Sequence, residues 1–415
     1  MFNSISPYLV TMLLTFRLLV LSGVAITQTV AINTPTGRVH DYKGLYVMIY
    51  PTWVPQTAAF ENALSKPFID GATVIMQWAV IEPRPGVFDF SSMDRWISSV
   101  VTKRKKISLG VMAGMWTPEW LYDSDHQVAK NVFVYNRSPQ GTPNCTRLAL
   151  PSPWHQSYIR EYNQMMREVA KHLHQLQIPD MGPDAAYEAL RIIKVAGINN
   201  TTEELRLYAN MYPRGDPGPC HQSDAPPIWA AAGFTPTKVV VAWTEIASNL
   251  AAVFPGKVLS VDIIQVNAFP PVDDSGRVYR PEPRSNDLLT TRIVEAGISR
   301  FSGRFAVQWN ALSNLPPNSA VVDAGARGAI EAWQMNEFLG SNGSGCIYGG
   351  RRSACRSPQD FQVVLNNGIN AGGQFIEIWA QNVDEFASAF QHAHERLVQR
   401  APSSPGRDSN SQPTD

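Results

Sequence analysis

Residues 73–96 read TVIMQWAVIEPRPGVFDFSSMDRW, and this stretch decides the predicted fold. Its first part, residues 73–81, is apolar and rich in β-branched side chains, which is typical of a buried strand. Glu82 follows the apolar run, and the prolines and glycine of residues 83–86 then break the chain. The serines at 91–92 can cap a helix that begins there. The stretch therefore predicts a strand, a turn and a helix, with a carboxylate at the carboxyl end of the strand.

Seven further apolar runs that end in polar residues occur along the chain. With the first, the predicted strands are Gly44–Tyr50, Thr73–Ile81, Ile107–Ala113, Leu190–Gly197, Val258–Asn267, Arg304–Ala311, Ala329–Asn336 and Gln374–Ala380. Continuous apolar strands indicate a parallel sheet that is buried on both faces. Eight strands are what a (β/α)8 TIM barrel needs. The sequence therefore predicts an α/β fold with a single-domain barrel over residues 40–400, and a two-domain α/β protein is the alternative.

Helical patterns separate several of these runs. The predicted helices are Trp154–Gln177, Pro236–Val253, Pro358–Asn367 and Val383–Arg400. Thr235 and Ser357 each precede a proline, which places a capping side chain before a proline at the first helical position. The longest βα loops follow the third, fourth and seventh strands, and in this fold such loops form the catalytic face.

A sequence pattern around the second strand resembles a known family. Trp78, Glu82-Pro83, Gly86, the triplet of residues 88–90 and Asp94 are similar to the second βα unit of (β/α)8 glycoside hydrolases, such as family 42 β-galactosidases and their cellulase-like relatives. The resemblance implies hydrolysis of O-glycosidic bonds. That reaction uses two carboxyl groups, one to protonate the leaving oxygen and one to attack the sugar or activate water.

The first carboxyl group is expected after the fourth strand. The sequence there reads VAGINNTTEEL over residues 195–205. By resemblance to relatives in which Gly-x-Asn is followed by a later Glu, Glu204 is the first candidate for the acid/base, with Glu203 in reserve. The alternative is structural, because acids are favoured in the first turn of a helix, here one capped by Thr201 or Thr202.

The second carboxyl group is expected near the last two strands. Alternation along residues 375–379 directs Glu377 into the barrel, where a carboxylate is costly unless it is paired or used. An ion pair with an arginine such as Arg191 is the structural alternative. Glu337, after the seventh strand, is the reserve. By resemblance, the position of the usual nucleophile holds Gln334, which raises the possibility of a non-catalytic carbohydrate-binding barrel. Glu82 is interpreted as structural.

Amide and aromatic side chains occur at most of the predicted strand exits. Such side chains can hydrogen-bond and stack on sugars, although each could equally be packing. The predicted substrate-binding residues are Gln77, Trp78, Trp116, Asn199, Gln308, Asn310, Gln334 and Trp379, with Trp53 and Trp120 on the same rim.

The N-terminal residues predict secretion. An apolar run over residues 8–31 is interrupted by Arg17, which favours a signal peptide over residues 1–31 and disfavours a membrane anchor. Secretion is consistent with sequons at Asn136, Asn144, Asn199, Asn200 and Asn342 and with an even number of cysteines. The loop positions of the cysteines predict disulfides Cys145–Cys220 and Cys346–Cys355, with free buried thiols as the alternative. The tail over residues 401–415 is expected to be disordered.

Composition and motifs exclude several classes of protein. The chain has 35 Lys plus Arg and 35 Asp plus Glu, so no nucleic-acid partner is expected. No GxSxG elbow, GxGxxG turn or P-loop is present. The histidine pairs 172/174 and 392/394 are two residues apart on helices, a spacing unsuited to a metal site. The predicted partner is an oligosaccharide or glycoside, with no cofactor and no metal.

Overall fold

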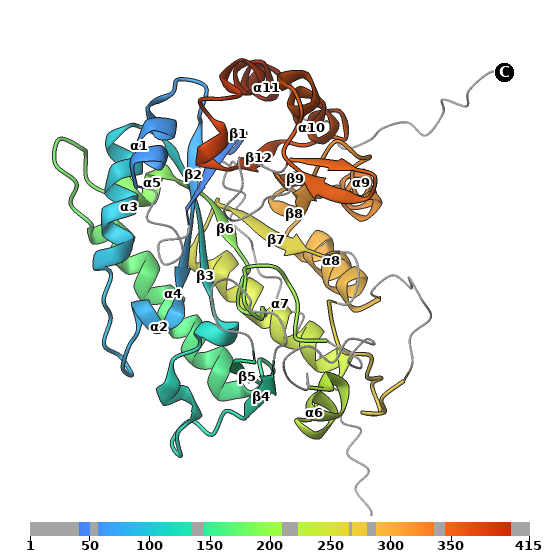
Figure 1. The fold of residues 1–415 in the computed structure, drawn as a ribbon. Helices are drawn as coiled ribbons and strands as arrows, with labels where there is room; N and C mark the ends of the chain where they lie inside the picture. Colours follow the sequence, from blue (N-terminus) through green and yellow to red (C-terminus); the bar gives the residue numbers. More distant parts are fainter. Residues whose placement is uncertain are drawn as a thin grey trace, which may run out of the picture. The chain divides into compact units, whose positions relative to one another are not determined.

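Eight parallel strands close into a barrel in the computed structural model (Figure 1). Around the barrel the order is β1, β12, β9, β8, β7, β6, β3 and β2, and β2 pairs with β1 to close the ring. The strands are β1 (Gly44–Ile49), β2 (Gly71–Gln77), β3 (Lys106–Met112), β6 (Leu190–Lys194), β7 (Val258–Ile263), β8 (Phe305–Leu312), β9 (Ile330–Met335) and β12 (Phe375–Ile378). All eight predicted strands and the predicted TIM barrel are confirmed.

The structure describes residues 41–49, 57–134, 145–209, 223–264, 268–279, 288–335 and 345–399, which all belong to one unit spanning 37–415. The predicted signal peptide (1–31) and tail (401–415) lie outside these ranges. Among the described residues, no helix combines the length and the apolar character needed to cross a membrane.

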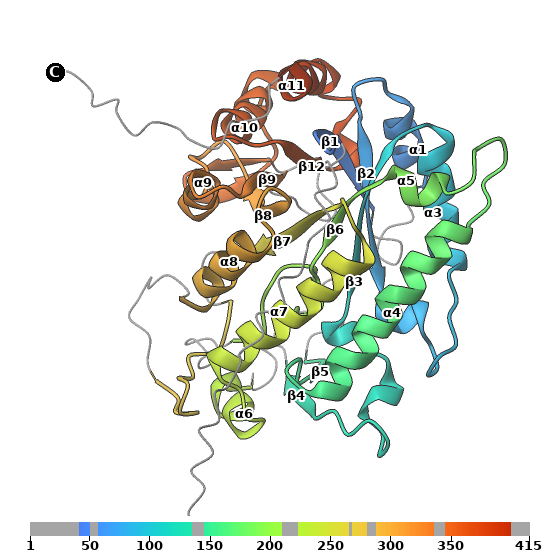
Figure 2. The same cartoon turned by 180° about the vertical axis from the view of Figure 1, so that it is seen from behind.

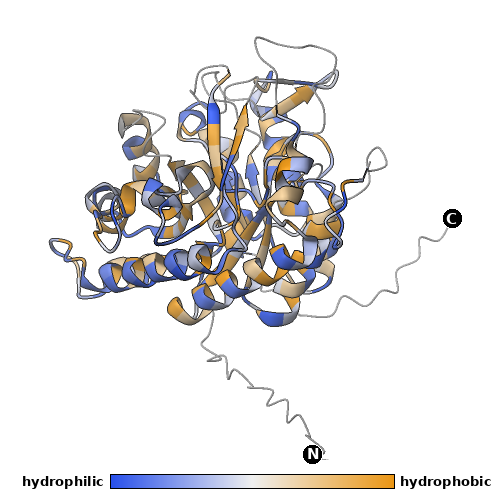
Figure 3. Cartoon of the chain, turned by 90° about the horizontal axis from the view of Figure 1, so that it is seen from below, coloured by the Kyte–Doolittle hydropathy of each residue, from blue (hydrophilic) through white to orange (hydrophobic). Residues whose placement is uncertain are grey.

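Helices cover the outside of the barrel (Figures 1 and 2). The larger ones are α1 (Thr57–Ser65), α3 (Ser91–Thr102), α4 (Gln156–Gln175), α7 (Pro236–Val253), α8 (Leu288–Arg300), α9 (Ser319–Ala326), α10 (Pro358–Asn370) and α11 (Ala387–Gln399). The short ones are α2 (Trp78–Ile81), α5 (Ala185–Ala189), α6 (Ala225–Ala231), η1 (Gly114–Trp116), η2 (Glu119–Tyr122) and η3 (Ala380–Asn382). Figure 3 shows apolar segments concentrated in the central strands, with polar segments on the helices. Burial of apolar side chains between strands and helices is the main force that holds these layers together.

Two of the predicted helix caps are confirmed and one is wrong. The Thr235 side chain accepts a hydrogen bond from the Lys238 N–H, and that of Ser357 accepts one from Asp360. Helix α3, however, begins at Ser91 after Phe90, whose side chain makes no capping hydrogen bond. Asp89 Oδ1 instead accepts from the Ser91 N–H at 3.0 Å, so a carboxylate outside the helix serves its first donor.

The second strand ends earlier than the sequence indicates. Pairing with β3 stops at Gln77, and Trp78–Ile81 forms the helical turn α2. Glu82 therefore follows a helical turn instead of a strand. Its Oε2 accepts from Trp78 Nε1 at 2.9 Å, and its Oε1 accepts from the Gly86 N–H at 3.0 Å. Glu82 therefore links the start of α2 to the turn that follows this helix. The structural interpretation of Glu82 agrees with these contacts.

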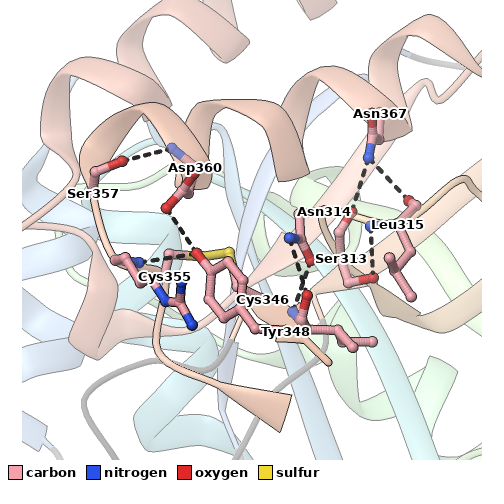
Figure 4. Close-up of a disulfide and its surroundings, with 11 residues drawn as sticks. Ser313, Asn314, Leu315, Cys346, Tyr348, Cys355, Ser357, Asp360 and Asn367 are labelled. Carbon is pink, nitrogen blue, oxygen red and sulfur yellow. Dashed lines mark hydrogen bonds between the residues drawn. A yellow bond between two sulfur atoms is a disulfide. The ribbon is translucent and has the colours of Figure 1, made fainter. Parts of the chain in front are cut away.

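The long βα loops carry small antiparallel hairpins. Strands β4 (Lys130–Val134) and β5 (Arg147–Pro151) pair within the loop after β3, and β10 (Cys346–Tyr348) pairs with β11 (Arg351–Ser353) within the loop after β9. The predicted Cys346–Cys355 disulfide is present and closes the second hairpin (Figure 4). Cys145 is also disulfide-bonded. Its predicted partner, Cys220, lies outside the described residues.

The interior of the barrel changes from apolar to polar along its axis. The end at which the strands begin is filled by Tyr46, Ile192, Val258, Ala306, Ile330, Ala332 and Phe375. Toward the carboxyl ends of the strands, buried polar and charged side chains replace this packing. The polar end is the face where barrel enzymes place their chemistry.

Candidate active site

Glu377 lies at the centre of the polar end, on β12, and its side chain is fully buried. Its Oε1 accepts from Thr73 Oγ1 at 2.7 Å, and its Oε2 accepts from Gln308 Nε2 at 2.7 Å. Alternation along β12 predicted this inward direction, and the structure confirms it. The carboxylate is therefore held between β2 and β8 by two donors from opposite sides of the barrel.

A buried lysine joins Glu377 to a second carboxylate. Lys194 Nζ lies 2.9 Å from Glu377 Oε1 and 2.7 Å from Asp262 Oδ2, and the three side chains are at most 1% exposed. The predicted arginine partner is wrong, because Arg191 donates to the Glu188 carbonyl instead. Arg191 lies at the start of β6, whereas Lys194 lies at its carboxyl end, which is the end nearer to Glu377.

Glu203 is the third carboxyl group of the cluster. Gln334 Nε2 lies 3.3 Å from Glu203 Oε1 and 3.4 Å from Glu377 Oε2. These two carboxylate oxygens are therefore at most about 6.7 Å apart, which is below the upper limit of about 9.5 Å for the carboxyl pairs of glycosidases. Asn310 Nδ2 also donates to Glu203 Oε1, at 3.1 Å. The side-chain amides of Asn310 on β8 and Gln334 on β9 thus hold the Glu203 carboxyl, and Gln334 also connects it to Glu377.

The carboxyl groups differ in their affinity for protons. Burial, and then the charges of Glu204 and Asp262, raise the pKa of Glu203 to about 8. Burial raises the pKa of Asp262 to about 6, against the lowering effect of Lys194. The pKa of Lys194 is raised, because the attraction of Asp262 and Glu377 outweighs its burial. At neutral pH the cluster therefore holds a protonated Glu203 beside a charged Lys194, and a protonated carboxyl is what a general acid requires.

The opposite side of the mouth is apolar. Met48, Ile75 and Met112 form a small buried cluster at the carboxyl ends of β1, β2 and β3, and Trp116 and Trp379 pack against it. Both tryptophans are partly exposed and are held by hydrogen bonds from their ring nitrogens to the carbonyls of Thr201 and Met335. Flat, partly exposed rings beside polar groups are a usual composition for a ligand site. Trp116 and Trp379 thus lie where they were predicted.

Glu204, the first candidate from sequence, is oriented differently from Glu203. Its Oε2 accepts from Thr202 Oγ1 and lies 3.3 Å from Arg206 Nη2. The structure does not bring Glu204 into the hydrogen-bond network of Glu377, and it places the reserve candidate Glu203 there instead. The predicted helix at this point is also wrong, because residues 201–204 form a bend. The other reserve candidate, Glu337, lies outside the described residues.

Two predicted binding residues are buried away from the mouth. Trp78 is fully buried and contacts the rings of Trp120, Tyr158 and Tyr162 edge-on. Because α2 rather than β2 contains Trp78, its ring is directed toward α4. The assignment of Trp78 to substrate binding is therefore wrong, and Trp120 shares its structural role.

Asn199 also hydrogen-bonds within the loop and does not point to the mouth of the barrel. Its Oδ1 accepts from the Ala113 N–H at 3.0 Å and its Nδ2 donates to the Thr202 carbonyl at 2.7 Å, so its amide is engaged at both ends. Asn199 and Asn200 are 3% and 7% exposed, which leaves no surface for a glycan, and the sequon interpretation is wrong at both. Asn136, Asn144, Asn342 and Trp53 lie outside the described residues.

The remaining predicted binding residues lie at the polar end of the barrel. Gln308 is fully buried and donates to both Glu377 and Asn310. Gln334 and Gln77 are 4% and 5% exposed. Gln308, Asn310 and Gln334 thus gather around the carboxyl groups, and the shared face of Gln308 and Asn310 was predicted. Gln77 ends β2, which pairs with β1 and β3.

Lys194 and Asp262 were missed, although the sequence carries a signal for both. Each is a charged residue inside a run that otherwise reads as a buried strand, RIIKVAG and VLSVDII. A charge at such a position is expensive unless it is paired or used. Within the described ranges, no group of three or more His, Cys, Asp or Glu side chains is arranged to hold a metal ion.

Sequence comparison links part of the chain to one family. The glycoside hydrolase 42 family, described as β-galactosidase, matches residues 69–178. This segment runs from the start of β2 to just beyond α4 and contains Glu82 and its turn. A search among curated proteins found no significant match.

Comparison with solved structures extends the similarity to most of the chain. The catalytic domain of a β-amylase from Paenibacillus polymyxa superposes with a TM-score of 0.53 at 13% identity, covering 88% of this chain and 100% of that one. A β-galactosidase from the Antarctic haloarchaeon Halorubrum lacusprofundi gives 0.50 at 12% identity, covering 87% of this chain and 59% of that one. At these identities the likeness concerns the fold. The chain therefore has the (β/α)8 barrel fold found in glycoside hydrolases.

Proposed function

We propose that this protein hydrolyses an O-glycosidic bond, with Glu203 as the acid/base and Glu377 as the second carboxylate. The main evidence for the proposal is that both carboxyl groups lie within hydrogen-bond distance of one atom, Gln334 Nε2. This nitrogen is 3.3 Å from Glu203 Oε1 and 3.4 Å from Glu377 Oε2. A protonated acid and a carboxylate at this spacing can act on the two sides of one sugar carbon. The match of residues 69–178 to the β-galactosidase family supports the same class of reaction.

The division of roles follows from the surroundings of each group. Glu203 retains its proton at neutral pH because burial and neighbouring acids raise its pKa to about 8. Glu377 has the ammonium group of Lys194 as an ion-pair partner, 2.9 Å from its Oε1. A proton donor and an anion are the two components that glycoside cleavage requires. Trp116 and Trp379 would provide the apolar wall for the sugar.

The test uses aryl glycosides and unactivated oligosaccharides, including β-galactosides and malto-oligosaccharides because the compared proteins are β-galactosidases and a β-amylase. We expect Glu203→Gln to lose at least 10²-fold of kcat/KM on unactivated substrates and much less on activated aryl glycosides, which need little acid assistance. Glu377→Gln is expected to lose activity on both kinds of substrate.

Glu204→Gln is the matched control. Glu204 is adjacent in sequence but its carboxylate is bound to Thr202 and Arg206, so its loss should leave most of the activity. Inactivity of Glu204→Gln together with full activity of Glu203→Gln would contradict our assignment and restore Glu204 as the acid/base.

A second candidate function is non-catalytic carbohydrate binding. It is favoured by Gln334, an amide on β9 where family resemblance leads one to expect a nucleophile. A wild-type protein that is inert on every glycoside but binds sugars on a glycan array would support this candidate and exclude hydrolysis.

Export from the cytosol is also part of our proposal. The apolar run over residues 8–31 and the Cys346–Cys355 disulfide support an oxidising destination. Expression of the full chain in a secreting eukaryotic cell, followed by N-terminal sequencing of the medium fraction, tests it. Recovery of the uncleaved chain inside the cell would contradict it.

A further inference from the structure

Among the described residues of the barrel interior, Lys194 is the one buried side chain with a positive charge beside the acidic groups. It lies at the carboxyl end of β6, is 1% exposed, and forms ion pairs with Glu377 on one side and Asp262 on the other. Neither hydrolytic step requires an amine. The structure therefore contains a costly buried charge that the reaction itself does not explain.

The neighbouring strands are shaped around the lysine. Gly110 on β3 faces both Ile75 and the lysine stem, and a Cβ atom there would lie 3.0 Å from Ile75 Cδ1, 3.2 Å from Lys194 Cβ and 3.4 Å from Lys194 Cδ. A glycine in the middle of a strand lowers stability, so its presence is consistent with a close approach by another side chain. The lysine stem passes this glycine, and its ammonium group lies between Asp262 and Glu377.

We propose that Lys194 is a positioning residue, which supplies the counter-charge of the Glu377 carboxylate and fixes its orientation, while Asp262 competes with Glu377 for the same ammonium group. This inference rests on the proposed function, because it assigns a purpose to the charge on Glu377. Lys194 does not touch the substrate and acts only through the carboxylate.

Other titratable groups also surround Glu377. Tyr46 on β1 lies within electrostatic range, and burial raises the pKa of this phenol, so it stays neutral. Glu203 and Glu204 belong to the loop after β6, and both interact with the cluster. Among these groups only Lys194 carries a positive charge, so its removal leaves Asp262 and Glu377 without their shared counter-ion.

The experiment measures kcat/KM as a function of pH with an activated aryl glycoside. Such a substrate needs little help from the proton donor Glu203, so the fall in activity at acidic pH (the acidic limb) reports the protonation of Glu377. Lys194→Met is expected to move this limb upward by about 1–3 pH units, the effect of an opposite charge at close range. Asp262→Asn is expected to move it downward, because Lys194 then serves Glu377 alone. Lys194→Arg, which keeps the charge, should restore a limb close to that of the wild type.

Lys257→Met is the matched control. Lys257 is also a buried lysine, 3% exposed, but it precedes β7 at the other end of the barrel and donates to the Tyr187 carbonyl. Its loss should lower stability and leave the acidic limb unchanged. Reduced activity of Lys194→Met with no movement of the limb, or movement in the same direction for Lys194→Met and Asp262→Asn, would overturn the proposal.

The proposal can be separated from the proposed function. If the wild type hydrolyses no glycoside, the function fails, and the charge on Glu377 is followed instead by carboxyl carbon NMR of protein labelled in glutamate. The signal that disappears in Glu377→Gln identifies the residue. Titration of that signal at the same pH in Lys194→Met and in the wild type would then overturn the role of Lys194 independently.

Discussion

Glu203 and Glu204 are neighbours in sequence, yet they occupy different chemical environments. Glu203 is 2% exposed and receives hydrogen bonds from Asn310 and Gln334, while Glu204 is paired with Arg206 at the edge of the loop. The difference arises because consecutive side chains in a bend point in different directions. A decision between two adjacent acids therefore depends on a few backbone angles.

The raised pKa of Glu203 makes the stability of the protein depend on pH. In the unfolded chain a Glu ionises near pH 4.3, whereas in the folded protein this carboxyl keeps its proton until about pH 8. Its contribution to stability is thus complete below the unfolded pKa and is lost as the pH rises toward the folded pKa. Glu203→Gln, which cannot titrate, should gain stability relative to the wild type between about pH 5 and 8, by roughly a few kcal/mol.

Urea denaturation of both proteins at several pH values measures this difference. Glu204→Gln serves as the control, because its carboxylate has an arginine partner in the folded state. A difference in unfolding free energy between wild type and Glu203→Gln that is constant over this range would contradict the protonated state of Glu203.

At the scale of elements, helix α7 depends on a cap that the sequence predicts. Thr235 Oγ1 accepts from the Lys238 N–H, which would otherwise lack a partner at the helix start. Thr235→Ala should cost about 1 kcal/mol of unfolding free energy. Ser92→Ala is the control, because Ser92 was a candidate cap but α3 makes no side-chain capping bond, and its effect should stay within about 0.5 kcal/mol. Equal losses in the two variants would argue against capping at Thr235.

The β10–β11 hairpin is held at the rim by a disulfide and by contacts to the barrel. Cys346 and Cys355 are nine positions apart, and closing a loop of this length should contribute roughly 2–3 kcal/mol. Asn314 also forms two hydrogen bonds with the backbone of Ile347, and Tyr348 donates to Asp360 (Figure 4).

Replacing both Cys346 and Cys355 by Ser should lower the melting temperature while kcat/KM at 25 °C stays within about twofold, because the polar contacts keep the hairpin in place. Reduction of the wild type with dithiothreitol should lower the melting temperature at least as much, because it also breaks the disulfide of Cys145. A large loss of activity at 25 °C would show instead that the hairpin depends on the disulfide for its position.

At the scale of the whole molecule, the polar end of the barrel is expected to lower the stability of the protein, and the proposed function would explain why the charges are kept. Removing one partner of a buried ion pair typically costs about 3–5 kcal/mol, whereas replacing the whole group by neutral side chains of similar size is often neutral or stabilising. We therefore expect Lys194→Met alone to be strongly destabilised. The triple variant Lys194→Met, Asp262→Asn and Glu377→Gln should be at least as stable as the wild type, and inactive.

Thermal and urea unfolding of the wild type, the single variant and the triple variant measure this relation. A triple variant that is less stable than Lys194→Met would mean that these charges hold the fold together. The outcome we expect would mean that the barrel keeps them at the expense of stability.

Local sequence patterns were enough to predict the barrel and the direction of most side chains on its strands. All eight strands were predicted because apolar, β-branched runs are a local signal that any parallel barrel must contain. The same periodicity placed Gln308, Asn310 and Glu377 on inward faces, while the family resemblance singled out Gln334. Strands that are buried on both faces must be apolar along their whole length, so the local pattern is sufficient to identify them.

Which of these groups meet could not be read from local patterns and depends on the folded ring of strands. The sequence favoured Glu204 over Glu203 and suggested Arg191 as the ion-pair partner, while Lys194 was missed. It also gave Trp78 a binding role, which α2 excludes by directing the ring toward α4. The loop after β6 has no periodicity, so its side-chain directions follow from contacts with β8 and β9, about 100 residues or more further along the chain. Contacts between such distant segments depend on the closed ring of strands, and no local pattern in the sequence can specify them.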